Sequence, residues 1–296
     1  MLLDLTEPLK SHLKDVGKTL QSNRHEAAGT FLHMGDVWAV AGAYEAYVGR
    51  WSRRVAADFV RWLGVPAGRR WLDAGCGTGA LTETVVDAAA PSTVVGVDMS
   101  RGFLGAARRR VPGARFVAAD ASALPLRAAG FDAVISGLAL NFVPGPQRAV
   151  SEFARVAAPG ATVAAYVWDY ADGMRMMRYF WDVATEVDPA AADRDEGPRF
   201  PICHPDALHE AWTEAGLADV ATRAIEVPTV FADFDDYWRP FLGGQGPGPA
   251  YVAAMPPDQR EAVRALLESR LPRESDGSIA LTARAWAARG EKASHF

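Results

Sequence analysis

The feature that most constrains this chain is the glycine-rich segment at residues 72–79, which reads LDAGCGTG. Gly75, Gly77 and Gly79 follow a short apolar run and precede a helix-like segment at 81–90. A strand that turns into a helix through alternating glycines uses their left-handed backbone angles. It also lets a ligand approach the backbone near the positive end of the helix. The segment therefore predicts a strand–loop–helix unit that binds a ligand.

Strand-like and helix-like segments alternate from residue 70 to residue 169. The expected strands are 70–73, 92–98, 114–120, 131–137 and 161–169, and the expected helices are 81–90, 100–110 and 145–160. Ser100 is the expected N-cap of the second of these helices. Such alternation with short connections predicts βαβ units in a doubly wound parallel sheet, an α/β fold.

The pattern changes on either side of this core. A helix capped by Ser52 is expected at 52–63. After Asp169 we expect helices at 173–187, 205–217 and 257–272, a short helix at the start of 233–249, and strands at 218–228 and 278–290. The resulting division is a leader (1–33), a helical lid (34–63), a core (64–168), an insertion that contributes to an acceptor pocket (169–249) and a C-terminal helix and strand that complete the sheet (250–296).

The first 33 residues differ in composition from the rest of the chain. They hold three of its four lysines and three of its six histidines. They fit a vector-derived leader or an over-extended start, and equally a natural amphipathic helix. We assign no chemistry to them.

Composition excludes several classes of protein. The chain has 296 residues, a net charge of −5 and two cysteines. No apolar run is long enough to cross a membrane, and no disulfide framework can form. The charge gives no reason to expect nucleic acid or an anionic membrane as a partner. We expect a cytoplasmic protein without a metal, because Cys203, His204 and His209 lack the number and spacing of zinc ligands.

Three carboxylates accompany the glycine loop. Asp73 precedes it, Asp98 ends the second expected strand, and Asp120 ends the third. An acid at the end of the second strand can accept both hydroxyls of a ribose, a feature that dinucleotide-binding enzymes share. The loop also fits their G-x-G-x-x-A pattern, so a nicotinamide-dependent oxidoreductase is an alternative at this point.

Five stretches carry a family resemblance: WLDAGCGTGALT (71–82), VVGVDMS (94–100), AADASALPL (118–126), FDAVISGLALNFV (131–143) and RVAAPGATVAAY (155–166). In this order and spacing they resemble the class I S-adenosylmethionine-dependent methyltransferases, in particular the small-molecule group that includes ubiquinone and menaquinone enzymes. The resemblance implies a Rossmann-like, seven-stranded, mostly parallel sheet with a helical insertion and an N-terminal lid. It also implies S-adenosylmethionine as the cofactor.

The resemblance assigns roles to the loop and to the acid before it. Gly75, Gly77 and Gly79 would approach the methionine part of the cofactor. Asp73 would orient the loop and reach the cofactor ammonium, directly or through water.

Roles along the following strands come from the same resemblance. Asp98 would hold the ribose, and Met99 would pack on the adenine. Asp120 would take the adenine amino group, with the Ala121 amide on a ring nitrogen. Ser136 and Gly137 would lie beside the methionine and the transferable methyl group. The plainer readings are a helix cap for Asp98, a turn for Asp120 and a structural loop acid for Asp73.

The segment AYEAYVGRWSR (43–53) resembles the lid of related enzymes. Tyr44, Tyr47 and Trp51 would contact the substrate, and Arg50 would meet the cofactor carboxylate or an anionic acceptor. The alternative is a helix packed on the sheet edge.

Trp168, Tyr237 and Trp238 are further candidates for the acceptor pocket, with plain core packing as the equal alternative. The possible proton acceptors are few. His204 and His209 lie at a helix start, where capping suits them better, and Asn141 either contacts the acceptor or fixes a turn. No catalytic residue is identified.

The lead prediction is methyl transfer to a small organic acceptor by in-line displacement, catalysed by proximity and desolvation. The alternatives are a non-catalytic S-adenosylmethionine-binding protein and the oxidoreductase above. The oligomeric state is not predicted.

Overall fold

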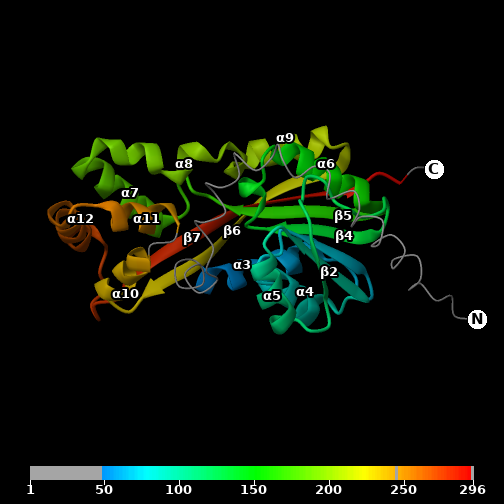
Figure 1. Cartoon of the computed structure of the whole chain (residues 1–296), viewed down its shortest axis with the longest axis horizontal. Coiled ribbons are helices and arrows are strands. Elements are labelled where there is room, and N and C mark those ends of the chain that lie inside the picture. The colour runs from blue at the N-terminus through cyan, green and yellow to red at the C-terminus, as the bar shows by residue number, and fades with distance from the viewer. Residues whose placement is uncertain (1–48, 244–245, 295–296) are drawn as a thin grey trace, which may run out of the picture. The chain divides into compact units, whose positions relative to one another are not determined.

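A seven-stranded sheet is the centre of the computed structural model, which describes residues 49–243 and 246–294 (Figure 1). The strand order is β3-β2-β1-β4-β5-β7-β6. Strands β1 to β5 are parallel, and β7 runs antiparallel to both of its neighbours. The strands are β1 (Arg70–Ala74), β2 (Thr93–Asp98), β3 (Arg115–Ala118), β4 (Phe131–Gly137), β5 (Ala157–Trp168), β6 (Leu217–Phe231) and β7 (Ile279–Lys292). This confirms the predicted Rossmann-like, mostly parallel sheet.

Helices cover both faces of the sheet, with α6 and α9 on one face and α3, α4 and α5 on the other (Figure 1). The helices are α3 (Arg50–Leu63), α4 (Ala80–Ala89), α5 (Arg101–Arg110), α6 (Pro146–Val156), α7 (Arg175–Val187), α8 (Glu196–Arg199), α9 (Pro205–Glu214), α10 (Phe234–Trp238), α11 (Pro247–Ala254) and α12 (Pro257–Arg270). The interior strands β4 and β5 are apolar on both faces, as a sheet covered by helices on both sides requires.

The order of the sheet reverses between β1 and β4, because β2 and β3 lie on one side of β1 and β5 on the far side of β4. In open α/β sheets a ligand binds at the carboxyl ends of the strands at such a switch point. The glycine loop after β1 and the residues after β4 both lie at this edge. The fold therefore places the predicted cofactor loop where a ligand crevice is expected.

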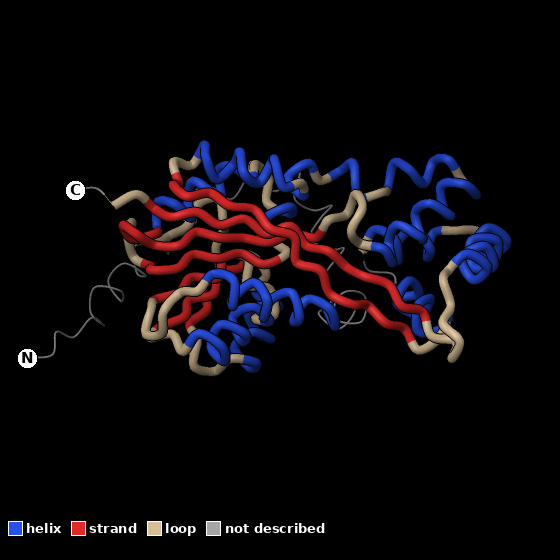
Figure 2. Tube along the Cα trace, turned by 180° about the vertical axis from the view of Figure 1, so that it is seen from behind, coloured by secondary structure: helices blue, strands red, loops and turns tan. Residues whose placement is uncertain are grey.

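Strands β6 and β7 continue as a two-stranded ribbon beyond the rest of the sheet (Figure 2). Strand β5 ends where Trp168 pairs with Ala285, whereas β6 and β7 stay paired to Phe231 and Ile279. Helices α7, α10, α11 and α12 gather around this end of the ribbon (Figure 1).

These helices come from two insertions. Helices α7, α8 and α9 lie between β5 and β6, and α10, α11 and α12 lie between β6 and β7. The expected insertion at 169–249 therefore contains the sheet strand β6, and its boundary with the C-terminal part falls inside α11. The expected leader (1–33) and the first half of the expected lid (34–63), residues 34–48, lie outside the described residues.

Two local expectations were wrong. Ser52 does not cap α3: the helix begins at Arg50, and the Ser52 hydroxyl donates to the Gly49 carbonyl. Helix α6 ends at Val156 rather than at residue 160, because the residue before Pro159 is disfavoured in helical conformation and the chain already enters β5. The predicted cap at Ser100 is confirmed, since its hydroxyl accepts from the Phe103 amide.

Within the described residues, no helix is long and apolar enough to cross a membrane. The same residues contain no cluster of three or more histidines, cysteines or acids that could hold a metal ion.

Candidate functional site

The glycine loop at the end of β1 adopts the backbone that only glycine accepts easily. Gly75, Gly77 and Gly79 have φ angles of 77°, 52° and 85°. A Cβ on Gly75 would lie 2.5 Å from the Cβ of Ala139, so the loop packs closely against the residues that follow β4. A Cβ on Gly77 would meet no atom within 4 Å, so the space over its backbone is open to a ligand.

Asp98 joins this loop to the start of α5. Its Oδ2 accepts from the Gly77 amide at 2.9 Å, and its Oδ1 accepts from the Ser100 amide at 2.7 Å. Burial raises the pKa of Asp98, and the two amide donors oppose that shift. The carboxylate thus serves the helix start, as the plainer reading held, and also fixes the glycine loop. Met99 beside it is 59% exposed.

Asp73 is the most unusual acid at the site. It is 1% exposed, and its Oδ2 accepts from the Thr82 hydroxyl at 2.7 Å. Its Oδ1 is buried without any hydrogen-bond partner. Burial raises the pKa of Asp73 to about 7, while the hydrogen bond from Thr82 lowers it and the charge of Asp98 raises it. A buried acceptor without a donor costs about 1–3 kcal/mol, so this atom suits a ligand that brings an N–H group.

Contrary to expectation, Asp120 does not end the third strand, because β3 ends at Ala118 and Asp120 lies in the irregular segment that follows. Its Oδ1 accepts from both the amide and the hydroxyl of Ser122, at 2.7 Å and 2.8 Å. The turn that the plainer reading proposed is therefore present. Ala121 between them is buried. The backbone conformation of this segment therefore determines the position of the Asp120 carboxylate.

The carboxyl end of β4 contributes small and polar residues. Ser136 is buried, and a Cβ on Gly137 would lie 2.7 Å from the Tyr166 hydroxyl oxygen. Asn141 follows in the short 3-10 helix η3 (Leu140–Phe142). Both its Oδ1 and its Nδ2 are buried without a partner, so its side chain fixes no turn. An orphaned amide in the segment after β4, which packs against the glycine loop through Ala139, is a group that a ligand can satisfy.

Arg50 begins α3 and lies on the ribbon. Its Nη1 pairs with Asp236 at 3.2 Å, and its guanidinium carbon lies 4.3 Å from the Trp51 ring centroid and 4.8 Å from that of Phe231. Its Nε and Nη2 are buried without partners. No pattern in the sequence pointed to Asp236, which lies 186 residues further along the chain. Tyr44 and Tyr47 lie outside the described residues.

The three aromatic candidates for the acceptor pocket are all buried. Trp168 ends β5 with its indole Nε1 unpartnered. The hydroxyl of Tyr237 donates to the Met176 carbonyl at 2.8 Å, and Trp238 stacks on Phe234. The structure shows these last two as packing residues, and contact with a substrate stays a prediction for all three.

His204 and His209 are both exposed. The Nδ1 of His204 accepts from the Asp206 amide at 3.3 Å, so it caps α9 as the sequence favoured.

The sheet order with an antiparallel last strand, the glycine loop and the acids along the carboxyl edge define a class I S-adenosylmethionine-dependent methyltransferase fold. Residues 72–165 match the methyltransferase domain family. This part of the chain is therefore similar to that family, and the dinucleotide alternative loses its support.

Curated relatives share this part of the chain. The demethylmenaquinone methyltransferase of Renibacterium salmoninarum is 34% identical over 145 residues, which cover 49% of this chain and 59% of the relative. The trans-aconitate 2-methyltransferase of Methylobacterium nodulans is 33% identical over 167 residues, which cover 55% and 62%. The chain thus spans roughly half the length of the curated relatives it matches.

Solved structures extend the likeness of the fold to most of the chain. The YcgJ protein of Bacillus subtilis has a TM-score of 0.56 at 17% identity and covers 82% of this chain and 100% of its own. The phosphoethanolamine N-methyltransferase 2 of Haemonchus contortus, solved with S-adenosyl-L-methionine, has a TM-score of 0.52 at 17% identity, covering 84% and 56%.

Proposed function

We propose that this chain transfers a methyl group from S-adenosylmethionine to a small organic acceptor. The observation that carries the proposal is the unpartnered Oδ1 of Asp73 beside a glycine loop with open space over Gly77. An ammonium group brought by the cofactor would satisfy that oxygen. The family of residues 72–165 supports the proposal, and so do the relatives, which are methyltransferases named for different acceptors.

S-adenosylmethionine, when bound, supplies a methyl group already activated as part of a sulfonium. The loop at 75–79 would hold its methionine part, with Ser136 and Gly137 beside the methyl group. Asp98 would accept from the ribose hydroxyls with the lone pairs that the Gly77 and Ser100 amides leave free. The exposed Met99 would cover one face of the adenine.

The adenine amino group and a ring nitrogen would be met by Asp120 and by the amide of Ala121. Asp120 is held by Ser122 through its Oδ1. Its carboxylate is therefore oriented before the cofactor arrives, which lowers the entropy cost of binding.

Alignment and exclusion of water carry the catalysis in this proposal. Holding two reactants in line is worth about 7–11 kcal/mol of the barrier, without any proton transfer. Asn141 would orient the acceptor with its free amide. The free Nε and Nη2 of Arg50 would bind the cofactor carboxylate or an anionic acceptor. Trp51 and Trp168 would bound the acceptor side, as would Tyr44, Tyr47, Tyr237 and Trp238.

The proposed reaction on a small molecule also leads to expectations about the partners and the location of the protein. With a net charge of −5, no nucleic-acid partner is proposed. The protein would work in the cytoplasm, where the cofactor is made and where the buried thiols of Cys76 and Cys203 stay reduced.

The test is calorimetric titration with S-adenosylhomocysteine and with NADH, followed by a methyl-release assay against a panel of acceptors. We expect binding of the first ligand only. Asp98→Ala should weaken it by at least about tenfold, because charge-assisted hydrogen bonds of about 1.5–3 kcal/mol are lost. Asp132→Ala, at the amino edge of the sheet, should leave the affinity unchanged. Binding of NADH alone would contradict the proposal, and cofactor binding without turnover on any acceptor would indicate a non-catalytic binding protein.

A further inference from the structure

The segment that carries Asp120 has no regular structure of its own. Residues 119–130 form neither helix nor strand between β3 and β4. Such a segment holds a fixed path only if its main-chain groups find partners elsewhere. Its first residues are those proposed to read the adenine, so the position of the adenine site depends on what holds this segment.

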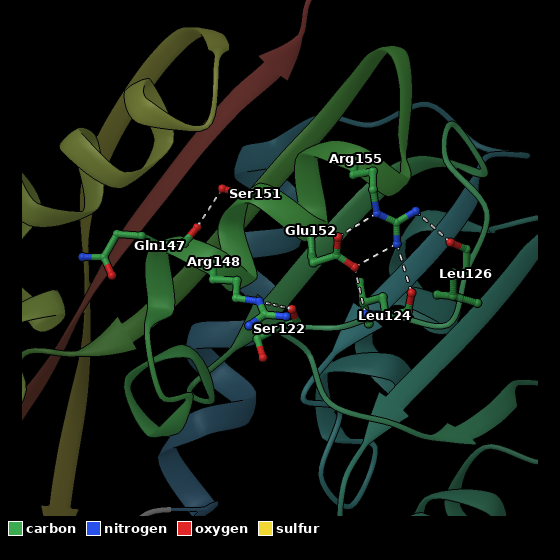
Figure 3. Close-up of polar contacts among 8 residues, drawn as sticks. All are labelled: Ser122, Leu124, Leu126, Gln147, Arg148, Ser151, Glu152 and Arg155. Carbon is green, nitrogen blue, oxygen red and sulfur yellow. Dashed lines mark hydrogen bonds and ion pairs between the residues drawn. The ribbon is translucent and has the colours of Figure 1, made fainter. Parts of the chain in front are cut away.

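Helix α6 supplies those partners from one face (Figure 3). Arg155 donates from Nη1 to the Leu126 carbonyl at 2.9 Å and from Nη2 to the Leu124 carbonyl at 3.0 Å. Glu152 accepts from the Leu124 amide at 2.9 Å. Arg148 donates from Nε to the Ser122 carbonyl at 3.1 Å. The side chains of α6 thus bond to the main chain of Ser122, Leu124 and Leu126.

Glu152 and Arg155 also hold each other. Arg155 donates from Nε and Nη2 to the two carboxylate oxygens at 2.7 Å and 2.8 Å. This hydrogen-bonded ion pair lowers the pKa of Glu152, which therefore stays ionised near neutral pH. We call this rigid pair of Glu152 and Arg155 the fork, and all three side-chain nitrogens of Arg155 donate hydrogen bonds.

The helix beneath this fork is itself firmly placed. Val150, Phe153 and Ala154 are buried on its opposite side. A hollow of about 550 Å³ lies over the fork, lined by Ser122, Ala123, Leu124, Arg148, Ser151, Glu152 and Arg155. The Ser151 hydroxyl bonds within α6, to the Gln147 carbonyl (Figure 3). The polar side chains of Ser122, Ser151, Glu152 and Arg155 that line the hollow all make hydrogen bonds within the protein.

The connection to Asp120 is short. The Ser122 carbonyl is held by Arg148, and the amide and hydroxyl of the same serine hold Asp120. A shift of the segment on α6 therefore moves the carboxylate that is proposed to face the adenine. A displacement of about 1 Å is enough to lose a positioned hydrogen bond.

We propose that Arg155, Glu152 and Arg148 are positioning residues that set the recognition of the adenine base by holding the segment at 119–126 on α6. This inference rests on the proposed function, because it takes Asp120 as the group that reads the base. None of the three residues touches the cofactor in this proposal. Their loss should therefore change which base is accepted more than it changes the methyl transfer itself.

The experiment measures the affinity of the full-length protein for two ligands by calorimetry. One is S-adenosylhomocysteine, and the other is S-inosylhomocysteine, in which a carbonyl oxygen replaces the adenine amino group and the ring nitrogen N1 carries a hydrogen. We expect the wild type to prefer adenine by about tenfold or more, as one lost hydrogen bond to a carboxylate implies. Arg155→Met should reduce that preference at least about threefold, since residues that act through one another are coupled.

Arg148→Met is the second variant, and it breaks a single hydrogen bond, so it keeps the test open if Arg155→Met does not fold. Arg70→Met is the matched control. It removes another bidentate arginine–carboxylate pair, with Asp132, at the amino edge of the sheet. It should leave the base preference unchanged. In an assay with an accepted substrate, Arg155→Met should raise KM for S-adenosylmethionine with little change in kcat.

The outcomes separate the two proposals. If both ligands lose affinity equally in Arg155→Met and Arg148→Met, the residues are merely structural and the inference is overturned. A wild type that binds both ligands equally would also overturn it, because Asp120 would then not read the base. If the wild type binds neither ligand, the proposed function fails and the inference falls with it.

Discussion

The proposed contact between the free oxygen of Asp73 and the cofactor predicts that cofactor binding depends on pH. The pKa of this acid is raised to about 7, so much of it is protonated at pH 6 and ionised at pH 8. A cofactor ammonium favours the ionised form. Binding of S-adenosylhomocysteine at pH 6 should therefore release a proton, and the affinity should rise from pH 6 to pH 8. Calorimetry in buffers of different ionisation enthalpy measures the release. Asp73→Asn should show none, and absence of release from the wild type would remove Asp73 from the ammonium site.

We expect substitutions of Asn141 and of the two histidines to have different effects on kcat. His204→Ala and His209→Ala should each keep kcat within about tenfold, below the usual 10²–10⁴-fold effect of losing a general base. Both are exposed, and His204 already caps α9. Asn141→Ala should cost more, because its free amide is the polar group proposed to orient the acceptor. Steady-state kinetics on an accepted substrate decide this, and a thousandfold loss in either histidine variant would identify a base.

For single residues, the sequence predicted the positions that follow from local spacing. It did not predict contacts between segments that lie far apart in the chain. The glycines, Asp98 and Asp120 lie at or just after the ends of strands, so their place at the carboxyl edge of the sheet could be predicted. The orphaned atoms of Asn141 could not, because only packing decides whether an amide finds a partner. Nor could the pairing of Arg50 with Asp236, which needs the ribbon to bring two distant segments together.

Among the elements, the strands were all predicted near their observed places, but the paired extension of β6 and β7 beyond the sheet was not. A buried parallel strand is rich in apolar residues, as β4 is between Asp132 and Ser136. Strand β6 was expected to end near Pro228, but it continues to Phe231. Proline is tolerated there because β6 is the edge strand and its missing N–H faces no neighbour. The fork of Glu152 and Arg155 on α6 was also not predicted. It binds main-chain groups, which every residue type carries, so the sequence shows no pattern for it.

The insertion around α7 and α8 contains a buried acid whose effect on stability can be measured. Glu196 is 2% exposed and accepts from the Trp181 indole at 2.6 Å. Burial raises its pKa to about 7, so the folded state holds this proton more tightly than the unfolded state. The contribution of Glu196 to stability is therefore largest below about pH 4.3, the unfolded value, and is lost as the pH rises to about 7.

Glu196→Gln keeps an acceptor for Trp181 and removes the ionisation. We expect the variant to melt at a higher temperature than the wild type at pH 8. Its free energy of unfolding at that pH should be larger by an amount on the order of 1–3 kcal/mol. The difference should shrink towards pH 5. Scanning calorimetry at the two pH values measures it. A variant less stable than the wild type at pH 8 would show that the charged form is well accommodated.

For the molecule as a whole, the proposal implies that the two edges of the sheet respond differently to the cofactor. Amide exchange should slow at the carboxyl edge when S-adenosylhomocysteine binds, around residues 75–79, 98–100, 119–122 and 136–141. The turns at the amino edge, such as 64–69 and 127–130, should not change. Mass spectrometry of exchanged peptides tests this. Equal protection of both edges would indicate global stabilisation without a located site.

The register of the ribbon has a consequence for how a protein of this kind can be altered. Phe231 and Ile279 are direct partners across β6 and β7, so the chain leaves and re-enters the ribbon within about 5 Å. Everything from 232 to 278 is therefore, in topological terms, the tip of one long hairpin. Recombination can replace such a tip as a single cassette, with one junction on each strand. Different partners for Arg50 could be offered by exchanged cassettes while the glycine loop and its acids stay untouched.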